Sequence, residues 1–310
     1  MKIAVPAEQA PGEARVAVSP ETVKAYLRKG FEVAVETGAG RGSFIPDAQF
    51  AAAGAVIAPN AEAALRDADI VLAVRRPAPA LLGALRRGAV VVGQMDPFAD
   101  PDGLRALALT GASVFAMELM PRITRAQSMD VLSSQANLAG YKAVIDAAAQ
   151  FGRAFPMMMT AAGYARELSP EDQKRQAALV ADHVKAQDVV ITTALIPGRP
   201  APVLLTSEMV DTMKPGAVIV DLAVERGGNC PLSRPGEVVV HGGVTIIGLA
   251  DAASKLAGNA SALYGRNLQN FLDLIIKDGG VTIDWNDEII AGCAIARDGA
   301  IVHPSLKSAA

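Results

Sequence analysis

Short aliphatic runs that alternate with helical segments constrain the fold of this chain more than any other feature of its sequence. Lys2–Pro6 is typical of a strand, and Pro20-Glu21 begins a helix that extends to about Lys29, with Ser19 as its N-cap. The same alternation continues along the chain. A strand–helix–strand rhythm predicts an α/β fold with mostly parallel sheets and right-handed crossovers.

Two groups of segments follow this rhythm, one on each side of a long Ala-rich helix predicted from about Ser133 to Phe151. The first group comprises strands at Phe31–Glu36, Ile70–Val74, Ala89–Gly93 and Ser113–Ala116 and helices at Asp47–Ala53 and Ala61–Asp67. The second comprises strands at Val189–Thr193, Ala217–Ala223 and Thr245–Leu249, a helix at Leu268–Ile276, and a terminal hairpin of Glu288–Ala296 and Ala300–Val302 around Asp298-Gly299. The long helix is therefore expected to link two domains.

Composition agrees with a buried α/β protein and argues against several other classes. The chain has 310 residues, of which 51% are hydrophobic, 20% charged and 4% aromatic, so two aliphatic cores are expected. A net charge of −3 without a basic block gives no support for nucleic-acid binding. Cys230 and Cys293 are expected as two buried thiols and not as metal ligands. No apolar run reaches the roughly 18–20 residues that cross a bilayer, so direct membrane insertion is not expected.

A glycine-rich segment, Gly38-Ala39-Gly40-Arg41-Gly42-Ser43, follows a predicted strand and imitates a dinucleotide-binding turn. Such a turn needs a helix that starts at once and an acidic residue about 20 positions later. Here Pro46-Asp47 delays the helix, and the later region reads Ile57-Ala58-Pro59. We interpret the segment as a loop that packs close to neighbouring backbone. No other segment of the sequence has G-x-G-x-x-G after a strand.

The segment Met117–Tyr141 concentrates Arg, Gln, Asp, Ser and Asn beside the start of the long helix. Polar residues in an aliphatic chain need partners, and a ligand with phosphate, ribose and carboxamide groups would supply them. A capped interdomain helix with a salt-bridged loop would supply them as well, so the spacing alone leaves both interpretations open.

The string MELMPRITRAQSMDVLSSQANLAGYKAV in this segment resembles the alpha subunit of proton-translocating NAD(P) transhydrogenases, which belong to the alanine dehydrogenase/transhydrogenase superfamily. The strings GEARVAVSPETV, FPMMMTAAG, ITTALIPGRPAPVLLT, MVDTMKPGAVIVDLAVERGGNCPLS and RDGAIVHPSL resemble the same family. The resemblance runs from Met1 nearly to the end of the chain. It implies two Rossmann-like domains, at 1–132 with 255–310 and at 133–254, with NAD(H) between them.

The resemblance also implies an activity and an assembly. The chain would be one component of a Re/Si-specific transhydrogenase, in which hydride passes between NAD(H) on this subunit and NADP(H) on a partner domain, coupled to proton translocation. Membrane-spanning and NADP(H)-binding subunits would be its partners, and the subunit itself a homodimer. Its expected location is cytoplasmic and peripheral to the inner (cytoplasmic) membrane. The transfer needs no protein acid or base, so the protein fixes distance and orientation.

Residue roles come from the same match. Arg122, Gln127 and Asp130 are the residues expected to act at the nicotinamide: Arg122 as a cationic donor, Gln127 to orient the carboxamide or ribose, and Asp130 with Ser133 to bind the carboxamide or hold the loop in shape. Leu195 matches a contact to the adenosine end, and Tyr164 matches a tyrosine of a mobile loop that closes over the nucleotide. The full set of expected cofactor contacts is Arg122, Ile123, Thr124, Arg125, Gln127, Ser128, Met129, Asp130, Ser133, Gly163, Tyr164, Gln176 and Leu195.

The sequence departs from the family after Gly163. There the family continues into a strand, a glycine-rich turn, a helix and a second strand that ends in an acidic residue, whereas this chain passes directly to Tyr164. The gap is roughly 65 residues, somewhat more than a βαβ unit, and it removes the phosphate-binding turn. The second domain is therefore expected to be truncated, and the edge of its strand Val189–Thr193 to be exposed, exchanged with a partner, or covered by Tyr164–Lys185.

Two alternatives remain. A degenerate subunit would keep its partner surfaces but bind nucleotide weakly. An alanine dehydrogenase-like enzyme would use Arg15 and Arg75, which lie near where that family holds its substrate carboxylate, but it also needs a proton donor, usually a histidine. The segment Gly93–Pro97, where we would expect that donor, has none, and Glu225 replaces the aspartate of the dehydrogenases. The histidines of this chain, expected to be surface or structural residues, are His183, His241 and His303.

Overall fold

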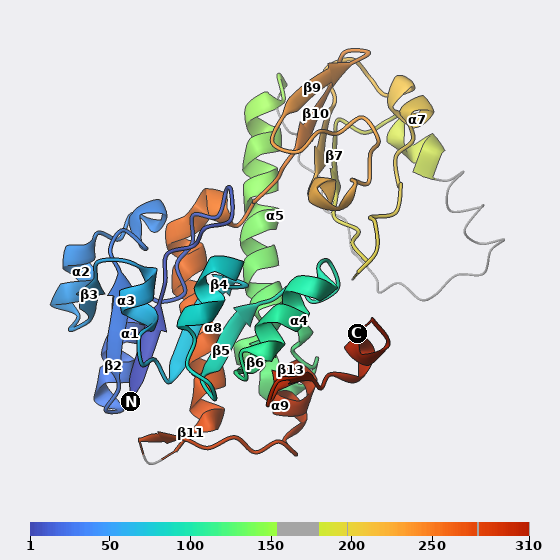
Figure 1. The fold of residues 1–310 in the computed structure, drawn as a ribbon. Helices are drawn as coiled ribbons and strands as arrows, with labels where there is room; N and C mark the ends of the chain where they lie inside the picture. The colour runs from blue at the N-terminus through green and yellow to red at the C-terminus, as the bar shows by residue number, and fades with distance from the viewer. Residues whose placement is uncertain (154–179, 197, 278, 310) are drawn as a thin grey trace. The chain divides into compact units, whose positions relative to one another are not determined.

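The computed structural model describes residues 1–153, 180–196, 198–277 and 279–309, which form two compact units. Unit 1 comprises Met1–Leu138 with Ala253–Ala310, and unit 2 comprises Ala139–Ala252. Figure 1 shows the mixed α/β architecture of each unit. The predicted α/β fold with Rossmann-like units and mostly parallel sheets is confirmed.

Unit 1 is built on a sheet that, in the described residues, has eight strands in the order β14-β13-β6-β5-β4-β1-β2-β3. The pairs from β3 to β6 are all parallel, and β13 joins β6 antiparallel. Its strands are β1 (Lys2–Val5), β2 (Glu32–Glu36), β3 (Val56–Ala58), β4 (Ile70–Arg75), β5 (Val90–Gln94), β6 (Ser113–Ala116), β13 (Ala294–Arg297) and β14 (Ala300–Ile301). Its helices are α1 (Pro20–Arg28), α2 (Asp47–Ala52), α3 (Ala61–Leu65), α4 (Pro101–Leu109), α8 (Ala257–Ile275) and α9 (Glu288–Cys293), and β11 (Ile276–Lys277) and β12 (Gly280–Val281) form a small separate hairpin.

Helices cover both faces of this sheet because successive strand residues point to opposite faces. One core joins Val5, Val33 and Leu72 to helices α1 and α8. A second core joins Val71 and Val91 to helices α3 and α4 on the other face. Both faces of the central strands are buried, which explains why these strands are continuous aliphatic runs.

The glycine-rich segment Gly38–Ser43 is a packing loop, as expected from the sequence. A Cβ atom on Gly40 would lie 2.3 Å from the carbonyl oxygen of Ile45, and one on Gly42 would lie 2.6 Å from that of Ala14. Both positions therefore need glycine for close approach of backbone segments. The loop contains a short 3₁₀ helix, Arg41–Ser43, and not the helix start that a dinucleotide turn requires.

Unit 2 has, among its described residues, a four-stranded sheet in the order β7-β8-β10-β9. Strands β7 (Val189–Thr192), β8 (Val218–Asp221) and β10 (Val244–Gly248) are parallel, and β9 (Val238–His241) joins β10 antiparallel. Helix α5 (Val131–Gln150) supplies Ala143 and Ala147 to one face, and α7 (Ser207–Asp211) packs on the other. In the described residues β7 is an edge strand, as expected for a sheet that lacks its neighbouring strand.

Two predicted elements were wrong in detail. Glu288–Ala296 was expected to be a strand, but Glu288–Cys293 is helix α9, capped by the Asp287 side chain, and only Ala294–Arg297 is strand β13. The late helix was expected to begin at Leu268, but α8 begins at Ala257. The hairpin turn at Asp298-Gly299 is confirmed, with both residues at positive φ.

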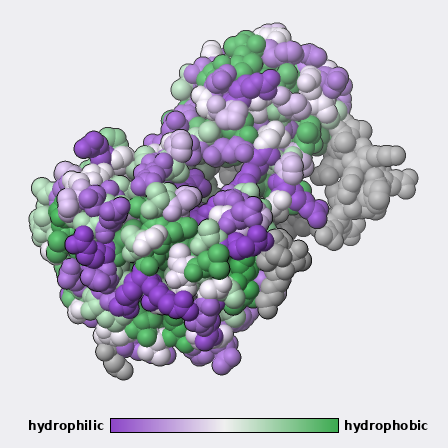
Figure 2. Space-filling model, viewed as in Figure 1, coloured by the Kyte–Doolittle hydropathy of each residue, from purple (hydrophilic) through white to green (hydrophobic). Residues whose placement is uncertain are grey.

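No described helix is both long and apolar enough to cross a membrane. The face of the molecule in Figure 2 carries hydrophobic residues scattered among hydrophilic ones.

Candidate functional site

The loop that the sequence assigned to the nicotinamide follows strand β6 in unit 1 and runs directly into helix α5. Its centre is a short 3₁₀ helix, Thr124–Met129. Ala126 and Met129 are buried in the main core of the unit, whereas Arg122, Thr124 and Gln127 are exposed. The loop therefore has one face fixed by the core and one polar face directed to solvent.

Helix α8 and the segment before α9 hold this loop from outside. Asn267 and Asn270 of α8 each donate a side-chain hydrogen bond to the carbonyl oxygen of Ser128, at 2.8 and 2.9 Å. Arg125 donates two hydrogen bonds to Asp287, at 2.6 and 2.9 Å. Arg125 was expected as a cofactor contact, and in this structure its guanidinium anchors the loop to the C-terminal segment.

Asp130 and Ser133 form the N-terminal cap of α5. The backbone nitrogen of Ser133 donates to one oxygen of Asp130 at 2.9 Å, and its hydroxyl donates to the other at 2.5 Å. Asp130 was expected either to bind the carboxamide or to hold the loop in shape. The cap supports the second of these roles, since both carboxylate oxygens are engaged where the loop enters the helix.

In unit 2, Leu195 lies in the loop that follows β7, and its side chain is 55% exposed. The preceding residue, Ala194, is fixed through both its nitrogen and its carbonyl oxygen. Its nitrogen donates to the side-chain oxygen of Asn229, and its carbonyl accepts from the side-chain nitrogen of Asn229, both at 2.9 Å. Leu195 is thus an exposed apolar side chain on a fixed backbone. Gly163, Tyr164 and Gln176, the other expected contacts of this domain, lie outside the described residues.

A buried ionic network in unit 1, missed by the sequence analysis, engages the two arginines of the dehydrogenase alternative. Arg15 donates to both oxygens of Glu13, at 2.7 and 2.5 Å, and Arg75 donates to Glu13 at 2.8 Å. Burial alone would raise the pKa of Glu13, but the hydrogen bonds from Arg15 and Ser254 and the charges of both arginines lower it to about 2. Arg15 also donates to Gln135 at 2.8 Å. These arginines therefore neutralise a permanent internal carboxylate.

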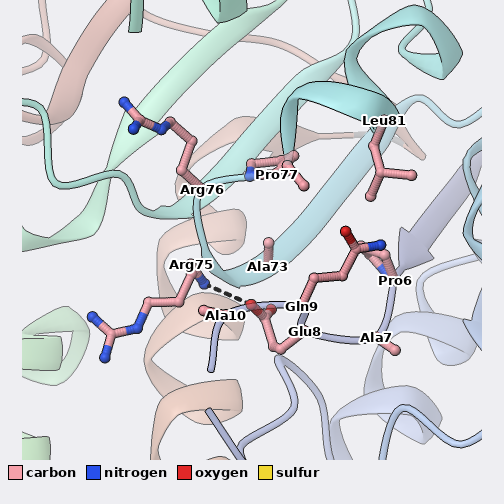
Figure 3. Close-up of a pocket in the computed structure, with 11 residues that line it drawn as sticks. Pro6, Ala7, Glu8, Gln9, Ala10, Ala73, Arg75, Arg76, Pro77 and Leu81 are labelled. Carbon is pink, nitrogen blue, oxygen red and sulfur yellow. Dashed lines mark hydrogen bonds between the residues drawn. The ribbon is translucent and has the colours of Figure 1, made fainter. Parts of the chain in front are cut away.

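A cavity of about 280 Å³ lies beside this network, lined by residues that follow β1 and β4 (Figure 3). Because the chain leaves β1 toward β2 on one side and toward β4 on the other, the cavity occupies a topological switch point, where open α/β sheets bind ligands. The Glu8 carboxylate accepts from the backbone nitrogens of Val74, at 2.6 Å, and Arg75, at 3.1 Å. Burial raises the pKa of Glu8 to about 7. Figure 3 shows the Arg75 and Arg76 guanidinium groups extending away from Pro6 and Leu81.

The region where a dehydrogenase would keep its proton donor is organised by a carboxylate instead. The backbone nitrogens of Met95 and Asp96 donate to Glu118, at 2.7 and 2.5 Å, and burial raises the pKa of Glu118. The three histidines lie elsewhere in the described structure: His183 is exposed, and His241 is 2.7 Å from Asp211. His303 accepts from the backbone nitrogen of Ser305. None of these three environments resembles that of a donor poised for a keto acid.

Sequence-family models match both halves of the chain. The N-terminal domain of the alanine dehydrogenase/PNT family matches residues 4–139, and its C-terminal domain matches residues 170–304. An NAD(P) transhydrogenase subunit alpha of Rhodospirillum rubrum is 44% identical, with 99% of each chain covered. The NAD(P) transhydrogenase subunit alpha of Cereibacter sphaeroides is 38% identical, with 98% of this chain and 71% of that protein covered.

The alignment with the Rhodospirillum rubrum protein spans 379 positions, 69 more than the 310 residues of this chain, so at least 69 positions have no residue here. That number is close to the size of the gap predicted after Gly163. The difference does not disturb the family match, since the identity extends over almost the whole of both chains.

Two solved structures show the same fold. A transhydrogenase from Sinorhizobium meliloti superimposes with a TM-score of 0.85 at 45% identity, covering 98% of this chain and all of that chain. An L-alanine dehydrogenase superimposes with a TM-score of 0.77 at 20% identity, covering 99% and 98%, which concerns the fold alone. By sequence and structure, the chain belongs to the alanine dehydrogenase/PNT family and, within it, to the alpha subunits of NAD(P) transhydrogenase.

Proposed function

We propose that this chain is the NAD(H)-binding subunit of a proton-translocating NAD(P) transhydrogenase, Re/Si-specific, in which hydride passes between NAD(H) on this chain and NADP(H) on a partner domain. The observation that carries the proposal is the loop Arg122–Asp130. Its exposed face offers the guanidinium of Arg122 and the amide of Gln127, and its backbone is fixed by Asn267 and Asn270. A donor-rich face on a rigid backbone suits a carboxamide, a ribose or a phosphate.

The chemistry asks little of the protein beyond orientation. The reduced nicotinamide carries the hydride, and neither an acid nor a base is needed for its transfer. Gln127 would orient the carboxamide through its paired donor and acceptor, and Arg122 would hold the anionic or amide end of the cofactor. The Asp130–Ser133 cap keeps the loop in register with α5. Orientation of this kind accounts for a large share of the rate in hydride transfer between two bound molecules.

The same proposal extends to the assembly. Membrane-spanning subunits would supply the proton path and the partner domain would supply NADP(H), with this chain as a homodimer on the cytoplasmic side of the membrane. The names of the relatives from Rhodospirillum rubrum and Cereibacter sphaeroides support a role as one subunit of several. Sedimentation of the purified chain, alone and with the partner subunits of a relative, tests this assembly.

NADH fluorescence titration tests binding directly. We expect saturable binding, about tenfold weaker in Arg122→Ala or Gln127→Ala because each loses a hydrogen-bonding partner of the cofactor. Arg105→Ala, which removes an exposed arginine of α4 engaged with Asp102, is the matched control. Equal affinities in all four chains would remove the loop from the nicotinamide site.

A degenerate subunit is the second candidate, and the 69 unmatched alignment positions favour it. If those positions include the phosphate-binding turn predicted to be missing, the cofactor loses backbone amides that bind its pyrophosphate. The wild-type titration separates the two candidates, because a degenerate subunit shows no saturation at millimolar NADH. The dehydrogenase alternative is disfavoured by the engagement of Arg15 and Arg75 with Glu13.

A further inference from the structure

One buried side chain in unit 2 joins the loops that follow β7 and β8. The side-chain nitrogen of Asn229 donates to the carbonyl oxygens of Ala194 and Pro202, at 2.9 and 2.7 Å, and its side-chain oxygen accepts from the nitrogen of Ala194. Its own carbonyl accepts from the nitrogens of Leu204 and Leu205, at 2.9 and 3.0 Å. Asn229 thereby fixes both ends of the loop between residues 194 and 205.

Asn229 is itself held by a buried carboxylate at the end of β8. Asp221 accepts from the backbone nitrogens of Asn229, at 2.9 Å, and Cys230, at 3.1 Å, and from the hydroxyl of Ser233, at 2.7 Å. Its other oxygen accepts from the hydroxyl of Thr192, at 3.2 Å, and from the backbone nitrogen two residues on, at 2.9 Å. Both Asp221 and Asn229 are fully buried. A carboxylate with this many donors is a rigid support, since few other arrangements would satisfy its charge.

The clamp presents two pairs of exposed apolar side chains. Each pair directly follows a residue that Asn229 binds: Leu195 and Ile196 follow Ala194, and Val203 and Leu204 follow Pro202. Their exposed fractions are 55% and 45% for the first pair and 56% and 41% for the second. Large apolar side chains on a fixed loop, beyond the carboxyl ends of parallel strands, suit a flat heteroaromatic ring.

We propose that Asn229, supported by Asp221, is a positioning residue for the adenosine end of NAD(H): it sets the height and spacing of Leu195 and Val203, on which the purine ring packs. The inference rests on the proposed function, because it assigns the support of one end of the same cofactor. It adds residues that touch no cofactor atom and act through the loop.

Asn229→Asp is the sharpest variant, because it keeps the size of the side chain and the acceptor for Ala194 but removes the donor to Ala194 and Pro202. We expect NADH to bind this variant about tenfold more weakly, as the loss of two hydrogen bonds from the loop implies. Reduced nicotinamide mononucleotide, which lacks the adenosine end, is expected to bind it as it binds the wild type. Asn60→Asp is the matched control, since the exposed Asn60 caps α3 through its side-chain oxygen, which the change retains.

A double-mutant cycle separates positioning from general damage. Leu195→Ala is exposed and is expected to lower NADH affinity alone, but to add little in a chain that already carries Asn229→Asp, since both act through one contact. Equal NADH affinity of Asn229→Asp and wild type, equal weakening of both ligands, or full additivity with Leu195→Ala would each overturn the proposal. Should Asn229→Asp not fold, wild-type affinity in both Leu195→Ala and Val203→Ala would overturn it. Absence of NADH binding by the wild-type chain would instead refute the proposed function, and this inference with it.

Discussion

Glu8 allows a quantitative prediction because its carboxyl titrates near neutral pH inside unit 1. Burial raises its pKa from the usual 4.5 to about 7, against the hydrogen bonds from Val74 and Arg75. A carboxyl with a raised pKa in the folded state favours folding at low pH, and this contribution is lost as pH rises through the folded value. At about 1.4 kcal/mol per pH unit, the interval from pH 4.5 to about 7 corresponds to about 3 kcal/mol of unfolding free energy.

The variant Glu8→Gln removes this titration. It forgoes about 1 kcal/mol at every pH, because its amide group can accept from only one of the two backbone nitrogens. Relative to wild type, its free energy of unfolding is therefore expected to rise by about 3 kcal/mol from about pH 4.5 to about pH 8, and it becomes the more stable chain at the higher pH.

Urea unfolding followed by tryptophan fluorescence measures this difference. The single tryptophan, Trp285, stacks on Phe115 in the core of unit 1 and reports on the unit that contains Glu8. Glu237→Gln, at an exposed glutamate of unit 2, is the matched control. Parallel pH profiles for wild type and Glu8→Gln would refute the reasoning, since they would mean that the Glu8 carboxyl has the same pKa in the folded and unfolded chain.

Three further predictions concern the backbone, the loop anchor and the thiols. Gly228→Ala should cost at least about 2 kcal/mol of thermal stability, because its Cβ would lie 2.7 Å from the buried carboxylate at a φ of +81°, whereas Gly227→Ala, in open space at +96°, should cost about 1 kcal/mol. Asp287→Ala should weaken NADH binding and accelerate hydrogen exchange in the segment 122–130, and unchanged exchange would contradict the anchoring role of this residue. Cys230 and Cys293 are buried free thiols, so they should react with a thiol reagent only as fast as the chain unfolds; rapid labelling of the native protein would contradict their burial.

The sequence predicted the elements whose signals are local. Ser19 caps α1 as expected, and its side chain and that of Thr22 form a reciprocal capping box. The start of α8 was missed because Gly258 and Gly265 lower helix propensity. In the structure both glycines lie where a Cβ would come within 3.3 Å of backbone oxygens in distant segments, so close packing of the helix overrides its propensity.

The candidate site was predictable only to a limited extent, for a similar reason. Arg122 and Gln127 were found because polar residues are dense in one segment of the chain. The support of the loop by Asn267 and the pairing of Arg125 with Asp287 join residues far apart in the sequence, and no spacing rule indicates such contacts. The same holds for Asp221, whose donors are mostly backbone amides that any residue could supply.

The division of unit 1 into two separated stretches sets the order in which the chain can acquire structure during synthesis. Strand β13, which completes the sheet beside β6, and helix α8, which covers one face, are made only after the whole of unit 2 has left the ribosome. Until then the aliphatic face under Tyr264, Phe271 and Leu272 has no cover from that helix. Contacts between such distant stretches close slowly and leave apolar surface available to chaperones or to neighbouring nascent chains. Unit 2, continuous from residue 139 to 252, meets no such delay and is expected to fold first.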